Sequence, residues 1–402
     1  MPEEQAVAGD RTARRWTLVA LAAAIFAGAA SMRILDALLP NIASFYGVSV
    51  GSAGLAVTAY SGSYSLCQII YGPLGDRAGP YKVVLLAALL SSMAAAGCAI
   101  APSINWLVAL RLLAGGVAAA IGPLALTWVS LATRIEQRPV VVANVTGASI
   151  IGATTGQVAG GVIGELFSWQ ASFLFIAMLF AVTALALCWA IVNRPHFATL
   201  GRRRFADGGA DRLAFKQLLA RRAVRVTLAG VGVEGLATYM TFTYASALLH
   251  QRFTTSAAIV GLLIALFGIG GVIFVLAARP LTAKLSEANR ARLGGSLMAG
   301  GFLFFGMARS PLAAGAALLI LGFGFFMFHN ILQVMATKMA PDAMGSAISL
   351  FAATFFLSQA AGALIGGWFF DRLGAWASCG ISACVLTGLG FAMARHSGGN
   401  AA

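Results

Sequence analysis

Apolar residues along this chain are grouped into long runs that short polar segments separate. Twelve runs are long enough for helices of about 20 residues, the length that crosses a hydrocarbon layer. The predicted spans are 16–39, 53–71, 82–100, 105–131, 140–163, 171–192, 224–249, 257–277, 292–308, 312–337, 344–367 and 374–394. They predict an all-α membrane protein of twelve transmembrane helices in two pseudo-symmetric six-helix bundles.

Polar segments give the expected domain limits. We expect an N-terminal tail over 1–15, a first bundle over 16–192, a central loop over 193–223, a second bundle over 224–394 and a C-terminal tail over 395–402. Only 10% of the residues are charged and the mean hydropathy is +0.86. Because a soluble domain is about one quarter charged, this composition excludes an ordinary soluble protein.

The basic residues are distributed unevenly between the two sides of these spans. The formal net charge is +14. Of the 27 Lys and Arg residues, 22 fall on the side of the N-terminus, two lie inside spans, and the other side holds only Arg252, Arg309 and Arg372. Such a bias predicts an inner-membrane protein with both termini in the cytoplasm. The basic central loop is then an orientation signal facing anionic lipid rather than a nucleic-acid site.

The two halves of the chain share a sequence pattern. Residues 156–165 and 362–371 both follow G-x3-G-G-x3-acid, at an offset of 206 residues. Gly54 and Gly261 are related by an offset of 207. A constant offset across distant spans indicates an internal duplication. Repeated halves with a site between them are typical of secondary transporters.

A glycine-rich segment follows the second predicted span. Residues 72–82 read G-P-L-G-D-R-A-G-P-Y-K. They resemble the signature loop of the major facilitator superfamily, G-x-L-x-D-R-x-G-x-[RK]-[RK], and depart from it at Pro80 and Tyr81. The resemblance implies a gating loop that holds the cytoplasmic side closed. Its residues here are Gly72, Gly75, Asp76, Arg77 and Gly79. The alternative is that Asp76 and Arg77 only solvate a turn.

Three further segments carry the same resemblance. Arg111 and Gly115 match the family's R-x3-G element, and Asp36 precedes a Leu-Pro pair as in bacterial drug and sugar efflux members. The fifth span is similar to the antiporter motif G-x3-G-P-x2-G-G. The matching residues are Gly152, Gly156, Gln157, Gly160 and Gly161. This motif implies export in the twelve-span drug:proton antiporter branch, but Gln157 replaces its proline, so uptake stays open. Glycines at this spacing also serve helix packing.

Charged residues inside spans are candidates for proton coupling, because a charge at membrane depth costs at least ~2.5–3.5 kcal/mol. Arg33 and Asp36 are three residues apart and share a helix face. Arg111 has a similar depth, so the three can form one cluster. We hypothesise that Asp36 exchanges protons and that Arg111 sets its proton affinity and orientation. The alternative is that Asp36 lies at the water boundary and simply pairs with Arg33.

Glu234 is the most deeply placed acid. It lies ten residues into the seventh span, roughly 15 Å deep at the rise of an α-helix. We hypothesise a second protonation site or a contact for a cationic substrate group. The alternative is a permanently protonated acid that packs between helices.

Polar and aromatic residues in the spans are weaker candidates for substrate contacts. They are Tyr60, Tyr64, Gln68, Tyr239, His329, Asn330 and Gln333. Such residues also stitch helices together.

The sequence contains no nucleotide-binding loop and none of the common hydrolase or metal-site motifs. We therefore expect a transporter that is not an enzyme and has no cofactor and no metal. The predicted function is proton-coupled efflux of a small amphipathic compound, such as a drug, sugar or metabolite, by alternating access. Proton-coupled uptake and a non-transporting membrane sensor or partner subunit are the alternatives. The expected partners are the small molecule, protons and the lipid bilayer, with the chain acting as a monomer and binding no nucleic acid.

Overall fold

A computed structural model describes residues 2–132, 138–193, 217–253, 255–340 and 344–399, and these contain helices and no strand. The N-terminal half holds α1 (Pro2–Arg33), α2 (Leu39–Tyr46), α3 (Val50–Ala78), α4 (Pro80–Ala99), α5 (Ile104–Ala118), α6 (Ile121–Ala132), α7 (Arg138–Leu166) and α8 (Trp169–Asn193). The C-terminal half holds α10 (Arg222–Phe242), α11 (Ala245–Phe253), α12 (Ala257–Lys284), α13 (Glu287–Met307), α14 (Pro311–Lys338), α15 (Met344–Leu373) and α16 (Ala375–Gly399).

The predicted spans all coincide with helices, and some coincide with a broken pair. The fourth span is divided into α5 and α6, and the seventh into α10 and α11. By length and composition, eight helices of the described chain can cross a membrane, or nine if α2 and α3, which are bent by 118°, count as one span. Fewer helices thus satisfy this length and composition than the twelve hydrophobic runs predict, although each run contains a helix.

Two predicted boundaries differ from the structure. Helix α1 ends at Arg33, and a turn over residues 34–38 leads into α2, so the first span is shorter than 16–39. Helix α3 continues through Ala78, which places most of the glycine-rich segment inside a helix instead of a loop. Only Gly79 separates α3 from α4, and its φ of 93° explains the glycine, since other residues rarely adopt that angle.

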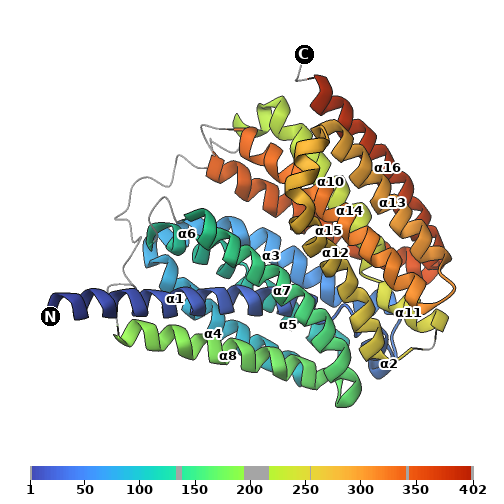
Figure 1. Cartoon of the computed structure of the whole chain (residues 1–402). Coiled ribbons are helices and arrows are strands. Elements are labelled where there is room, and N and C mark those ends of the chain that lie inside the picture. The colour runs from blue at the N-terminus through green and yellow to red at the C-terminus, as the bar shows by residue number, and fades with distance from the viewer. Residues whose placement is uncertain (1, 133–137, 194–216, 254, 341–343, 400–402) are drawn as a thin grey trace.

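The two halves lie side by side, as the blue-to-green and the yellow-to-red parts of Figure 1 show. Helix α3 packs along α15, α7 packs along α12, and α2 lies beside α11. Each of the two long contacts pairs one helix from either half. The duplication relates α3 to α12 and α7 to α15, so the two contacts are equivalent to each other.

Two carboxylates join the halves at one end of the molecule, which we call the closed end and define by residues 49–54, 161–165, 256–261 and 366–371. Asp371 on α15 accepts hydrogen bonds from the Ser49 hydroxyl (2.6 Å) and the Gly51 amide (3.1 Å) at the start of α3. Glu165 on α7 accepts a 2.8 Å bond from the Ala258 amide at the start of α12. Anions are stabilised at helix N-termini, so each half caps a helix of the other.

Glycines allow the backbones to meet at the closed end. A Cβ on Gly161 would overlap the Ala257 carbonyl and lie 3.1 Å from the Gly261 Cα. Gly51 likewise faces the Gly367 carbonyl. Close approach at both contacts needs residues without side chains, which accounts for the glycines that the two halves share.

Candidate functional site

A cavity of about 280 Å³ lies between the halves, and nine helices contribute to its walls. Its N-terminal wall comes from α1, α3, α6 and α7, together with Ala118 at the end of α5. Its C-terminal wall comes from α10, α12, α14 and α15. A cavity shared by two repeated halves is where a secondary transporter places its substrate.

The Asp36 carboxylate lies beside this cavity, in the turn after α1. Its Oδ2 accepts a 3.0 Å hydrogen bond from Gln157 Nε2 and lies 3.9 Å from Arg33 Nη1. The side chain of Asp36 is only 3% exposed. Arg33 also donates to the Tyr239 hydroxyl, and its guanidinium carbon lies 4.7 Å from the centre of that ring. Since Tyr239 is on α10, Arg33 connects the two halves across the cavity.

The glycines of α7 bring Gln157 to Asp36. A Cβ on Gly152, Gly156 or Gly160 would overlap the backbone carbonyl of Phe26, Ala30 or Ile34. Helix α7 therefore lies directly on α1. Gln157 stands where the antiporter motif has proline. Its amide gives the buried carboxylate the hydrogen-bond donor that a proline lacks.

Arg111 is buried away from the cavity surface. Its guanidinium donates to the Ser31 carbonyl (3.0 Å) and the Ala56 carbonyl (3.4 Å), and its guanidinium carbon lies 4.0 Å from the centre of the Tyr60 ring. It forms no ion pair with Asp36, although both residues are described. The structure therefore shows Arg111 joining α5 to α1 and α3. The hypothesis that it sets the proton affinity of Asp36 stays a prediction.

Glu234 and His329 form the second buried polar pair. Glu234 Oε2 lies 2.8 Å from His329 Nδ1, while Glu234 Oε1 has no hydrogen-bond partner among the described residues. The glutamate is fully buried, and the His329 side chain is 12% exposed. Phe325 stacks on the His329 ring at 5.3 Å between centres, and Phe355 lies at 4.7 Å. The imidazole therefore separates the carboxylate from the cavity.

The structure distinguishes between the expected substrate contacts. Tyr64, Tyr239, His329 and Gln333 line the cavity. The residues Tyr60, Gln68 and Asn330 are not part of its lining. Sequence reasoning treated Glu234 and His329 separately, because they are 95 positions apart and three helices lie between α10 and α14.

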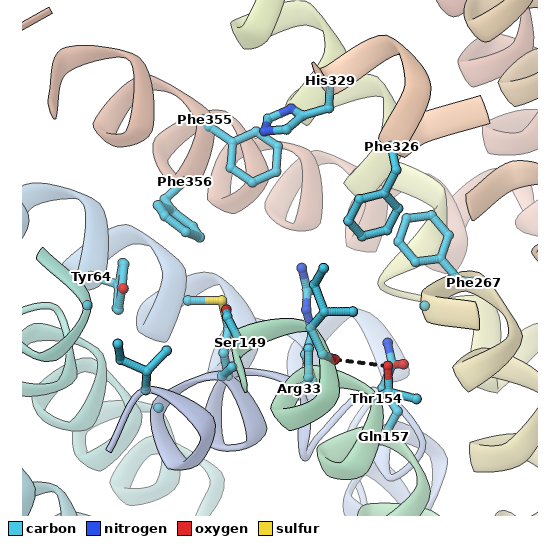
Figure 2. A pocket seen from close by; sticks show the side chains of 18 of the residues that line it. Arg33, Tyr64, Ser149, Thr154, Gln157, Phe267, Phe326, His329, Phe355 and Phe356 are labelled. Atoms are coloured by element: carbon cyan, nitrogen blue, oxygen red, sulfur yellow. Dashed lines mark hydrogen bonds between the residues drawn. The ribbon is translucent and has the colours of Figure 1, made fainter. Parts of the chain in front are cut away.

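An aromatic wall was missed by the sequence analysis. The C-terminal half contributes five phenylalanines: Phe267, Phe325, Phe326, Phe355 and Phe356. In Figure 2 the labelled ones lie above Arg33, Thr154 and Gln157. The run of four phenylalanines over 323–328 was the available signal. It could not show which rings face the cavity, since adjacent helix positions point about 100° apart.

The residues of the expected gating loop are only partly described. The surroundings of Gly72 and Asp76 lie outside what the structure describes. Gly75 packs against the Leu124 side chain, Arg77 is exposed, and Gly79 forms the turn before α4. Among the described residues, no three His, Cys, Asp or Glu side chains are grouped as a metal site would require.

Comparison with known proteins identifies the family. The sequence model of the Major Facilitator Superfamily matches residues 21–363. The chain belongs to the Major Facilitator Superfamily. It is therefore a multi-span membrane transporter and not an enzyme. The twelve-span, two-bundle fold predicted from the sequence is that of this family.

Its relatives include proteins with efflux names. The "Uncharacterized MFS-type transporter YfhI" of Bacillus subtilis is 26% identical over 368 residues, which cover 90% of this chain and 88% of YfhI. The "Multi-drug resistance efflux pump PmrA" of Streptococcus pneumoniae is 32% identical over 138 residues, 34% of each chain. The chain thus resembles the drug-efflux branch of the family.

A solved structure supports the fold alone. The crystal structure of the peptide transporter POT in complex with sulfate superposes with a TM-score of 0.77, at 16% identity over 95% of each chain.

Proposed function

We propose that this protein is a proton-coupled secondary transporter that exports a small amphipathic compound across the bacterial inner membrane. The observation that carries the proposal is the pair of buried carboxylates beside the central cavity. Asp36 comes from the N-terminal half and Glu234 from the C-terminal half. Buried acids at membrane depth are costly, so their presence beside a cavity favours a role in proton movement.

The two acids are connected through one helix of the C-terminal half. Helix α10 carries Glu234 and, five residues later, Tyr239, which accepts a hydrogen bond from Arg33. Arg33 in turn lies 3.9 Å from Asp36. Protonation of Asp36 would remove one of the two partners of Arg33. We propose that this change is transmitted to α10 and thereby to Glu234 and His329.

The structure corresponds in this account to the inward-facing state, with the closed end toward the outside. The uneven distribution of lysine and arginine supports that orientation, because the closed end lies on the side that holds few of them. Rocking the halves would then separate Asp371 from α3 and Glu165 from α12. The cavity would open outward as those contacts break.

Export is the proposed direction, since similar proteins are named multidrug efflux pumps. Uptake by symport is the second candidate, and Gln157 favours it, because this residue replaces the proline of the export-associated motif. Transport of a labelled compound into everted vesicles and into right-side-out vesicles tests the direction. Proton-driven accumulation in everted vesicles alone supports export, whereas accumulation in right-side-out vesicles alone supports uptake.

A further inference from the structure

The two walls of the cavity differ in chemistry. The N-terminal half presents small residues of α1 and α7, among them Gly28, Ala29, Ser149 and Ala153, beside larger ones such as Met32 and Tyr64. The C-terminal half presents the five phenylalanines named above. Figure 2 shows Phe267 and Phe326 facing the side of the cavity that holds Arg33. A flat aromatic ring can therefore lie between the small residues of α1 and α7 and the phenylalanines of the C-terminal half.

Among the described residues, Arg33 is the one permanently charged side chain that lines the cavity. One of its nitrogens donates to Tyr239, and another lies 3.9 Å from Asp36, which is at the outer limit of an ion pair. A guanidinium has five N–H donors, so several are left for a ligand. The nearby carboxylates are not accessible to a ligand in the cavity. Asp36 is 3% exposed and bound by Gln157, and Glu234 is fully buried behind His329.

We infer that the substrate is a compact aromatic carboxylate, with its ring against the phenylalanines and its carboxylate on Arg33. Arginine binds carboxylates with two parallel hydrogen bonds, and aromatic pairs add specific ring contacts. A cationic ligand would instead meet the like charge of Arg33, with no Asp or Glu side chain among the described lining residues to bind it. The volume of about 280 Å³ lies at the lower end of ligand pockets and suits one or two fused rings.

This inference rests on the proposed role of the cavity in transport. It concerns only the binding step, so the vesicle experiment above decides the direction separately. Glu234 gives no support to a cationic ligand, because a cation would have to displace His329 before reaching the carboxylate.

Binding of three ligands with the same ring tests the inference. Isothermal titration calorimetry on the purified full-length protein in detergent would compare 1-naphthoate, 1-naphthamide and 1-naphthylmethylammonium. We expect 1-naphthoate to bind at least tenfold more tightly than the other two. The Arg33→Gln variant should lose this preference. Phe326→Leu should weaken binding of 1-naphthoate and 1-naphthamide by similar factors. Arg252→Gln, which removes a cation of α11 that lies outside the cavity lining and packs on Trp376 (4.3 Å), should leave the order unchanged.

The outcomes separate this inference from the proposed function. Equal affinities, no binding, or tightest binding of 1-naphthylmethylammonium to the unmodified protein would overturn it and leave proton-coupled transport standing. Retention of the carboxylate preference in Arg33→Gln would also overturn it. Selective binding of 1-naphthoate without any proton-coupled transport would support the inference and contradict the proposed function.

Discussion

Substitution of Gly161 by alanine should open the closed end. Helices α7 and α12 meet there, and the added methyl group would overlap the Ala257 carbonyl and approach the Gly261 Cα at 3.1 Å. Overpacking of this kind costs about 1–3 kcal/mol. Because about 1.4 kcal/mol changes an equilibrium tenfold, the ratio of closed to open molecules should fall by about 5- to 140-fold.

Helix propensity does not account for this shift. Alanine stabilises a helix by about 1 kcal/mol relative to glycine, but α7 is helical in both conformations, so that gain cancels between them. Gly147→Ala on the same helix is the matched control, since no atom in the part of the chain that the structure describes lies within 4 Å of its added methyl group.

Distance measurement between spin labels is the assay. Ile100 and Leu312 are highly exposed, at 81% and 82%, and lie in opposite halves, Ile100 directly after α4 and Leu312 in the first turn of α14. Labels on cysteines at these two positions, with the five native cysteines replaced, report the separation of the halves. We expect Gly161→Ala to move the distribution to longer distances and Gly147→Ala to leave it unchanged. Identical distributions for Gly161→Ala, Gly147→Ala and the parent would refute the reasoning.

Two further predictions concern hydrogen bonds to carboxylates. The Ala258 amide, followed by the Ser256 hydroxyl, holds the pKa of Glu165 below its ordinary value of 4.5. A depressed pKa stabilises the closed end above pH 4.5 and loses that effect as the pH falls through the lowered pKa. The two spin labels should thus move apart in acid, and Glu165→Gln should reduce this change in distance. An undiminished change in that variant would contradict the proposed role of the hydrogen bond between Glu165 and the Ala258 amide. Gln157→Leu should destabilise the protein by about 1–3 kcal/mol, because the buried Asp36 carboxylate loses its donor. In thermal unfolding, Gln157→Leu should cost less stability when Asp36→Asn is also present. Strictly additive effects of the two substitutions would count against the hydrogen bond between Gln157 and Asp36.

The helices were predictable because apolar runs of membrane length leave little choice of secondary structure. The internal repeat also includes the two acids of the closed end, since Glu165 and Asp371 occupy equivalent positions in the two halves. Boundaries were less predictable. The glycines after position 71 suggested a loop, yet α3 continues to Ala78, because neighbouring helices stabilise glycines that would weaken an isolated helix.

The partners of the buried charges were only partly predictable. Arg33 and Asp36 are close in sequence, and their proximity follows from helix geometry. The pairing of Glu234 with His329 depends on the rotations of α10 and α14, which one sequence does not specify. Arg111 was expected near Asp36 on grounds of depth alone, whereas its guanidinium points to the carbonyls of Ser31 and Ala56.

Substrate-induced proton movement in proteoliposomes tests the central claim most directly. Liposomes containing a pH-sensitive dye would be challenged with a mixed compound library that includes aromatic carboxylates. The parent, Asp36→Asn, Glu234→Gln and Glu287→Gln, an acid outside the cavity, would be compared after equal folding is verified by size-exclusion chromatography. We predict proton movement with the parent and Glu287→Gln, and its loss in Asp36→Asn or Glu234→Gln. Proton movement that persists in both cavity variants would contradict the proposed role of these acids.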